Sequence, residues 1–155
     1  MTVSLEDSSA PNGGVLLPII VRWGDMDALG HVNNTLYFRY CESARIAYLD
    51  ATGVWTHDQR GPEGPATVAA NLNFRRQVVY PAELTVSARV VAIGERSYTF
   101  DHIVRDTADG QVVADGQAVC VWIHYAEGKA LTLPDALLEA IARIERRPDL
   151  RRPGR

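Results

Sequence analysis

The stretch that decides the fold runs from residue 33 to residue 53 and reads NNTLYFRYCESARIAYLDATG. Apolar residues recur in it at spacings of three and four, which is the pattern of one helix of about five turns. These residues are Tyr37, Tyr40, Cys41, Ala44, Ala47, Tyr48 and Ala51. Asn33 or Asn34 can cap the first free amides, and Gly53 can close the C-terminus in the left-handed conformation. The sequence therefore predicts a long helix whose two ends are both marked.

The segments on either side of this helix favour strands. Residues 15–23 form an apolar, β-branched run, whereas residues 54–66 carry two Gly-Pro-type breaks and predict a long loop. Residues 134–145 predict a short amphipathic helix, and β-type patterning marks residues 67–75, 83–93, 97–106 and 111–125. The long helix can bury its apolar stripe only against the concave face of a sheet. We therefore expect an α+β domain with a long central helix wrapped by a curled five-stranded antiparallel sheet.

The composition describes one globular domain. The chain has 155 residues, of which 46% are hydrophobic and 23% are charged. We expect a single domain at residues 15–145, between a flexible lead-in at 1–14 and a basic flexible tail at 146–155. Sixteen Lys and Arg against 19 Asp and Glu give a net charge of −3, which argues against nucleic-acid binding. Cys41 and Cys120 are expected as reduced core thiols.

Neither a membrane span nor a secretory signal is expected. The longest apolar run, at residues 15–21, is far shorter than the ~20 residues that a span requires. The first 14 residues have no basic start followed by a long apolar stretch. A cytoplasmic location is therefore expected by default.

Polar residues concentrate at the start of the long helix, in the segment 24–34, GDMDALGHVNN. The GxSxG, GxGxxG, P-loop and HExxH motifs are missing and the four histidines lack ligand spacing, so neither metal nor organic cofactor is expected. The first turn of a helix has free amides and a partial positive charge, which can polarise a carbonyl and hold an oxyanion. A carboxylate just upstream can act on the same carbon as general base or nucleophile.

The run D-x-D-x-x-G-H-V-N-N-x-x-Y, from Asp25 to Tyr37, resembles a known family. It is similar to the hotdog-fold acyl-CoA thioesterases, and most similar to the 4-hydroxybenzoyl-CoA thioesterase-like family in its HVNN variant. The resemblance covers roughly residues 15–130 and includes the pattern Glu-x-Ala-Arg at 42–45. It implies a hotdog fold and the hydrolysis of an acyl-CoA to a free acid and coenzyme A. It also implies a homodimer whose sheets join edge to edge, with active sites at the interface, and often a homotetramer.

The resemblance also implies roles for individual residues. Asp27, and not Asp25, matches the catalytic carboxylate, and the backbone amide of Asn34 matches the donor to the thioester carbonyl. His31 would orient water, substrate or Asp27. The residues expected to contact substrate are Asn33, Tyr37, Arg96 and Ser97, the last two at the nucleotide end of coenzyme A. Leu29 stands where the related plant acyl-carrier-protein thioesterases have Asn, so an Asn-assisted mechanism is not expected.

Each of these residues also has a purely structural interpretation. Asp27 can be a turn former, His31 a structural hydrogen-bonding residue, and Asn33 and Asn34 simple helix caps. Tyr37 can belong to the core, and Arg96 and Ser97 to an ordinary turn. The adjacent Arg75 and Arg76, or the Arg-rich tail, can contact the same phosphates or remain solvated surface charges.

Two other functions remain open on the sequence. One is a non-catalytic protein that binds acyl or aromatic ligands on the same scaffold. The other is a hotdog dehydratase, which requires a catalytic His paired with a Glu of the partner; His31 has no obvious Glu at a matching site, and Glu42 lies well downstream. The sequence leaves open the acyl chain, the choice between coenzyme A and a carrier protein, the base or nucleophile role of Asp27, and the choice of dimer or tetramer.

Overall fold

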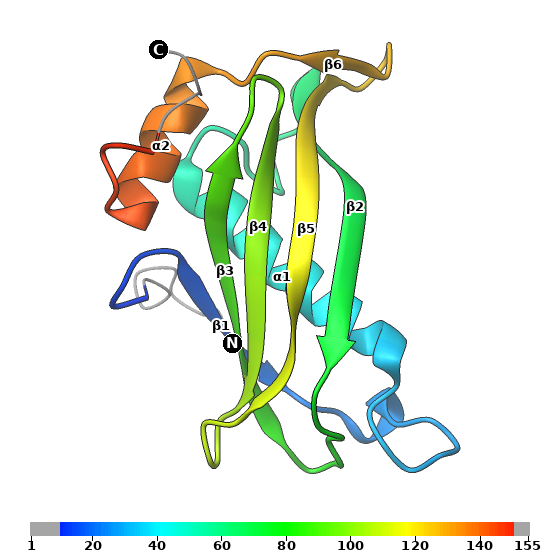
Figure 1. Cartoon of the computed structure of the whole chain (residues 1–155). Helices are drawn as coiled ribbons and strands as arrows, with labels where there is room; N and C mark the ends of the chain where they lie inside the picture. The colour runs from blue at the N-terminus through cyan, green and yellow to red at the C-terminus, as the bar shows by residue number, and fades with distance from the viewer. Residues whose placement is uncertain (1–9, 151–155) are drawn as a thin grey trace.

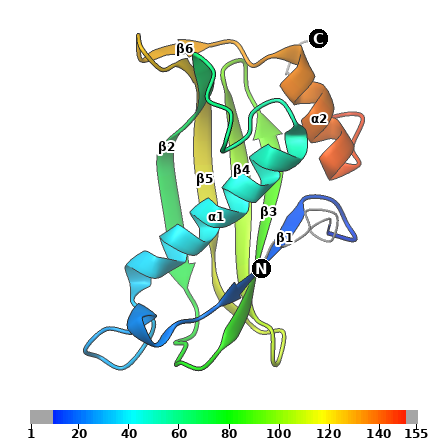
Figure 2. The ribbon, with the colours of Figure 1, turned by 180° about the vertical axis from the view of Figure 1, so that it is seen from behind.

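The computed structural model describes residues 10–150. One antiparallel sheet curls around helix α1, Asn34–Thr52, which crosses the concave face of the sheet (Figures 1 and 2). The strand order is β1-β3-β4-β5-β2, and β6 pairs with β5. The strands are β1 Val15–Ile20, β2 Glu63–Phe74, β3 Glu83–Ile93, β4 Ser97–Asp106, β5 Val112–His124 and β6 Lys129–Leu131. A 3-10 turn, Trp23–Asp25, precedes α1, and helix α2, Asp135–Glu145, follows the sheet. The expected helix wrapped by a curled sheet is confirmed.

Helix α1 begins and ends where the sequence predicts. The side-chain oxygen of Asn33 accepts a hydrogen bond from the amide of Thr35 at 2.9 Å, which caps the first turn. Gly53 closes the C-terminus with φ of 68°, a conformation that glycine adopts without strain. The buried face packs on the sheet and contains most of the predicted stripe, namely Tyr37, Tyr40, Cys41, Ala44, Ala47 and Tyr48. Helix α1 is therefore the centre of the core.

The concave face of the sheet supplies the other half of the core. Along β3 and β4, whose bounds match the prediction, buried and half-buried residues alternate. The inner residues of these strands are Leu84, Val86, Ala88 and Val90 on β3 and Tyr98, Phe100, His102 and Val104 on β4. On β5 a side chain at Gly116 would collide with the carbonyl oxygen of Asn71 on β2. Glycine there lets the two strands lie closely together.

The sheet differs from the prediction at two places. Strand β2 begins at Glu63, four residues before the predicted start at 67, although Pro65 lies within it. Proline is tolerated because β2 lies at the edge of the five-strand path, where an amide that faces outward needs no partner strand. The predicted loop therefore ends at 62. The three-residue β6, which the sequence did not indicate, adds a sixth strand to the five that were expected.

The expected lead-in and tail are only partly described, because residues 1–9 and 151–155 lie outside the described part. Near the start of that part, the amide of Gly14 donates to the carbonyl of Ile144 at 3.1 Å, and Gly13 packs on the backbone of Glu145. At the other end, Leu150 is buried. Both cysteines are buried free thiols, as expected. No helix within residues 10–150 is long and apolar enough to cross a membrane.

A buried carboxylate joins α2 to the rest of the core. Glu145, the last residue of α2, is 2% exposed. Its Oε1 accepts from the hydroxyl of Tyr48 at 2.9 Å and from the amide of Val90 at 2.8 Å, and its Oε2 accepts from Nε of Arg89 at 3.2 Å. The register between β3 and β4 shifts just after Val90, between Val90 and Ala92. Glu145 thus connects α2 with α1 and with the bulge of β3.

Glu145→Ala is expected to lower the free energy of unfolding by about 2–4 kcal/mol, because it leaves the Val90 amide and the Tyr48 hydroxyl buried without a partner. Chemical denaturation followed by circular dichroism measures this change. Glu139→Ala on the exposed side of the same helix is the matched control and should change the value by less than about 0.5 kcal/mol. Equal effects of the two substitutions would contradict the anchoring role of Glu145.

Candidate active site

A tight turn between β1 and α1 holds Asp27. The amide of Asp27 donates to the carbonyl of His31, and the amide of Gly30 donates to the carbonyl of Asp27, each at 3.0 Å. Oδ1 of Asp27 accepts from the amide of Leu29 at 2.9 Å, so this carboxylate does form a turn. Oδ2 of Asp27 has no hydrogen-bond partner within residues 10–150. One oxygen therefore positions the side chain while the other is free.

The neighbouring carboxylate has a different environment. Oδ2 of Asp25 accepts from the amide of Arg22 at 3.0 Å and from the hydroxyl of Tyr40 at 2.7 Å. Burial, together with this hydrogen bond, raises the pKa of Tyr40 well above its ordinary value, so the phenol stays protonated and donates. Asp25 thus ties the 3-10 turn to helix α1. Two carboxylates only two residues apart have separate surroundings.

The first turn of α1 presents a free backbone donor. The side-chain oxygen of Asn33 is used for capping, because it accepts from both the amide of Thr35 at 2.9 Å and its hydroxyl at 2.8 Å. The amide of Asn34, the first residue of the helix, has no acceptor among residues 10–150. It lies at the positive end of the dipole of a 19-residue helix. This amide can donate to an oxygen that approaches the helix axis.

One cavity of about 480 Å³ brings together Asp27, His31, Asn34 and Tyr37. Its volume falls in the range of small-molecule sites. The remaining lining residues are Leu29, Val32, Phe74, Arg75, Arg76 and Gln77. Asn33, which caps the helix, does not line the cavity.

A contact between residues distant in sequence brings the linker after β2 to one wall of the cavity. The amide of Val32 donates to the carbonyl of Val78 at 2.9 Å, which brings the linker beside the turn that carries Asp27. Phe74 and Gln77, which line the cavity from this side, were not found by sequence reasoning. No local pattern could have identified them, because their place depends on how β2 crosses α1.

Tyr37 forms an apolar wall of the cavity. It is 3% exposed, and its ring packs edge to face on Phe74 at 5.5 Å and on Tyr40 at 5.9 Å. Burial raises the pKa of Tyr37, so the hydroxyl stays protonated at neutral pH. This residue is suited to pack against a ligand rather than to transfer a proton.

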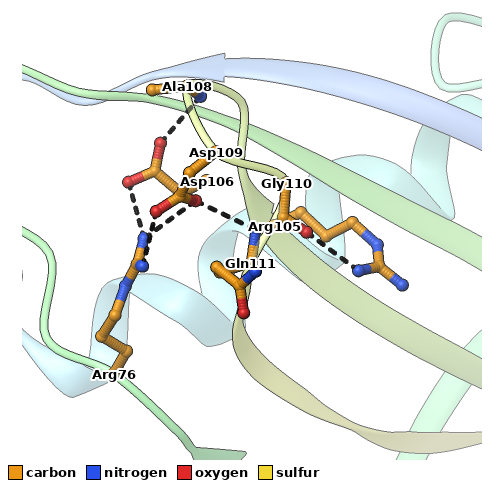
Figure 3. Close-up of polar contacts among 7 residues, drawn as sticks. All are labelled: Arg76, Arg105, Asp106, Ala108, Asp109, Gly110 and Gln111. Atoms are coloured by element: carbon orange, nitrogen blue, oxygen red, sulfur yellow. Dashed lines mark hydrogen bonds and ion pairs between the residues drawn. The ribbon is translucent and has the colours of Figure 1, made fainter.

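The two arginines at the rim of the cavity are both ion-paired. Arg75 binds both carboxylate oxygens of Asp115, at 2.9 and 3.1 Å. Figure 3 shows Arg76 facing the turn between β4 and β5, where it binds Asp109 at 2.7 Å and Asp106 at 3.0 Å. The guanidinium of Arg76 holds the pKa of Asp109 below its usual value. Both arginines are thus ion-paired and partly exposed, and their contact with a phosphate stays a prediction.

Arg96 and Ser97 lie far from this cavity within one chain. Arg96 lies in the connection between β3 and β4, and Ser97 begins β4, at the opposite end of the sheet from the start of α1 (Figure 1). The carbonyl of Arg96 accepts from the amide of Trp122 at 3.0 Å, and that of Ser97 accepts from Gly94 at 2.7 Å. The structure does not bring these two residues to Asp27, and their contact with substrate stays a prediction. Within residues 10–150, no group of three or more His, Cys, Asp or Glu could hold a metal ion.

Comparison with known proteins agrees with this geometry. Residues 21–141 match the family described as the Thioesterase-like superfamily. The long-chain acyl-CoA thioesterase FadM of Escherichia coli K12 is 29% identical over 126 residues, which are 81% of this chain and 96% of FadM.

Two solved structures extend the comparison. The PA2801 protein of Pseudomonas aeruginosa, a candidate thioesterase, is 36% identical, with a TM-score of 0.76 and coverage of 82% of this chain and 97% of that chain. A thioesterase from Thermus thermophilus, solved with coenzyme A and Zn, is 30% identical, with a TM-score of 0.77 and coverage of 90% of this chain and 99% of that chain.

Proposed function

The chain belongs to the thioesterase-like superfamily, and from this premise we propose that it hydrolyses the thioester bond of an acyl-CoA to a free acid and coenzyme A. The observation that carries the proposal is the cavity that Asp27 and Asn34 line together. Asp27 has a carboxylate oxygen without a partner among the described residues, and Asn34 has a free backbone amide, which supports their proposed roles. The names of the relatives FadM and the Thermus thioesterase support coenzyme A as the thiol carrier.

The Asn34 amide and the Asp27 carboxylate would act on different atoms of the thioester carbonyl. The amide of Asn34 donates to the carbonyl oxygen and stabilises the oxyanion that forms on attack, with help from the α1 dipole. Asp27 acts on the carbonyl carbon in one of two ways. As general base it takes a proton from the attacking water; as nucleophile it forms a mixed anhydride that water then cleaves. In both routes the C–S bond breaks and the coenzyme A thiolate leaves and takes up a proton.

His31 and Tyr37 would complete the site. His31 lines the same cavity as Asp27 and would orient water or the carboxylate. Tyr37 would pack against the part of the acyl chain next to the thioester. Incorporation of oxygen-18 from water into Asp27 during a single turnover distinguishes nucleophile from base.

The direct test is a panel of acyl-CoA thioesters with a reagent that detects the released thiol. Thiol release at ~1–10³ s⁻¹ on at least one thioester is the expected result. Tight binding of the panel without thiol release would contradict the proposal and favour the non-catalytic binding protein instead. Fatty-acyl and aromatic thioesters belong in the panel, because the cavity wall contains both Tyr37 and Phe74.

We also propose that the active unit is a homodimer joined along β2. This strand of 12 residues lies at the edge of the five-strand path, and among the described residues it pairs with β5 alone. Its apolar side chains are unusually exposed, with Val68 at 60% and Phe74 at 47%. A long exposed edge of this kind is a template for another strand. A second copy of the chain, related by a two-fold axis, would pair its β2 antiparallel with this β2 and so cover the exposed edge.

Val68→Glu is expected to convert the dimer to the 17.1 kDa monomer and to lower activity, because it would bring two carboxylates close together near the two-fold axis. Sedimentation velocity measures the mass. Val91→Glu, at a residue that is 43% exposed on β3 and away from the edge, is the matched control and should remain dimeric. A Val68→Glu protein that is still a dimer would contradict pairing through β2. The further pairing of dimers and the cytoplasmic location stay predictions.

A further inference from the structure

A second cavity lies between α1 and the strands β2 and β5, nearer the C-terminal half of the helix. Its volume is about 270 Å³, which is below the range of complete ligand sites and suits the end of a ligand. Its walls include Arg45, Leu49, Trp55, Pro65, Thr67 and Cys120. The wall is mostly apolar and contains two charged side chains, the cation Arg45 and the carboxylate of Glu42.

That cation, Arg45, has no anionic partner among the described residues. It is 9% exposed, and its Nη1 lies 3.3 Å from Nε2 of His102. Nδ1 of His102 lies 2.9 Å from the carbonyl of Ser87, so the ring donates there and accepts from Arg45. Burial lowers the pKa of His102 to about 4, which keeps the ring neutral at pH 7. Glu42 also lines the cavity but pairs with another arginine, and the ion pairs described for residues 10–150 include none with Arg45.

A buried hydroxyl without a partner among the described residues lies on β4, next to the strand that contributes Cys120 to the cavity. Tyr98 is 1% exposed, and its hydroxyl has no hydrogen-bond partner within the described residues. In the register of the sheet Tyr98 lies opposite Cys120, which lines the cavity. Burial raises the pKa of Tyr98, so the phenol stays protonated and can donate. A buried O–H without a partner is costly, unless a ligand accepts its hydrogen bond.

We propose that this cavity receives the distal end of the acyl group and favours acyl chains that end in a carboxylate. Arg45 would supply the opposite charge, and the Tyr98 hydroxyl would donate to the same carboxylate. The apolar walls would contact the methylene groups between this carboxylate and the thioester. The inference rests on the proposed thioester hydrolysis and names its substrate class, namely coenzyme A monothioesters of dicarboxylic acids.

The proposed dimer explains how one acyl chain reaches both cavities. Full-length antiparallel pairing of two β2 strands places residue 63 of one copy opposite residue 74 of the other. Pro65 and Thr67 line the second cavity near the start of β2, whereas Phe74 lines the catalytic cavity at its end. The catalytic cavity of one copy therefore adjoins the second cavity of the other copy. A thioester held at Asp27 would point its acyl chain toward Arg45 of the second copy.

Matched pairs of thioesters test this preference. The pairs are the coenzyme A monothioesters of succinic, adipic and suberic acids against butyryl-, hexanoyl- and octanoyl-CoA. At the chain length that spans the two cavities, we expect kcat/KM to favour the carboxylated member by about tenfold or more. Tyr98→Phe, which removes a single oxygen, should reduce that ratio by about tenfold, and Arg45→Met should abolish it. Tyr80→Phe, at a residue that is 42% exposed, is the matched control and should keep the ratio.

Non-cleavable thioether analogues of the same pairs separate this inference from the proposed function. Cleavage of both series at equal rates, with equal dissociation constants for the analogues, would overturn the carboxylate preference and leave thioester hydrolysis intact. A ratio that survives Tyr98→Phe would overturn it as well, and this variant keeps the test valid if Arg45→Met fails to fold. Tighter binding of carboxylated analogues by a protein that cleaves no thioester would support the cavity and reject the hydrolase.

Discussion

Asp27→Asn is expected to lower kcat for acyl-CoA hydrolysis by about 100-fold or more, with the protein still folded. The amide of Asn can still accept from the Leu29 backbone, so the turn persists, but it can neither take a proton from water nor attack the thioester. Because the loss lies in the chemical step, KM should change little. Steady-state kinetics with a thiol reagent, together with an unchanged circular dichroism spectrum, measures the effect.

Asp25→Asn is the matched control for this change. Asp25 is two residues away and binds Tyr40 and the Arg22 amide, so its replacement should lower the melting temperature and reduce kcat by less than about tenfold. If Asp27→Asn retains full turnover while Asp25→Asn loses it, the two carboxylates have been assigned the wrong way round.

Asn34→Pro and Asn34→Ala are expected to differ by about 100-fold in kcat. Proline removes the backbone N–H that would hold the oxyanion, and loss of one such donor typically lowers kcat by about 10²–10³. The substitution suits the fold, because proline is favoured at the first helical position and the preceding Asn33 has an extended ψ of 134°. Alanine retains the N–H, so Asn34→Ala should lose less than about tenfold. Asn34→Ala should also lose less than Asp27→Ala, because the proposed donor is the backbone and not the side chain.

The losses of kcat in Asn34→Pro and Asn34→Ala distinguish a backbone contact with substrate from a side-chain contact. Equal losses, with α1 intact by circular dichroism, would mean that the side chain and not the backbone contacts the substrate. Full activity of Asn34→Pro would remove the helix terminus from the mechanism altogether. The same assay with purified protein serves for both comparisons.

The parts of the fold that local chemistry determines could be predicted from the sequence. Asn33 and Gly53 mark the ends of α1 because capping and the left-handed conformation depend on single residues. Strands β3 and β4 were predicted with their observed bounds, because alternation on a half-buried sheet is also a local pattern. The start of β2 was missed because Gly64 and Pro65 resemble a loop unless the strand is known to lie at an edge.

The candidate site was predictable only along one stretch of chain. Asp27, His31, Asn34 and Tyr37 are close in sequence and line one cavity, whose opposite wall comes from residues 74–77. That wall, like the ion pairs of Arg75 and Arg76, depends on contacts between residues that are distant in sequence. The polar groups at the second cavity also depend on contacts between residues that are distant in sequence. Arg45 and His102, for example, are 57 residues apart.

Helix α1 serves both the core and the candidate site, since its buried face fills the core and its first turn lines the cavity that contains Asp27. Any loosening of this helix would therefore abolish turnover before the chain unfolds globally. Evolution toward new acyl groups would have to spare α1 and to vary the linker behind β2 and the residues of the second cavity that lie outside the helix, namely Trp55, Pro65, Thr67 and Cys120. Directed-evolution libraries should likewise concentrate on those positions and leave the helix unchanged.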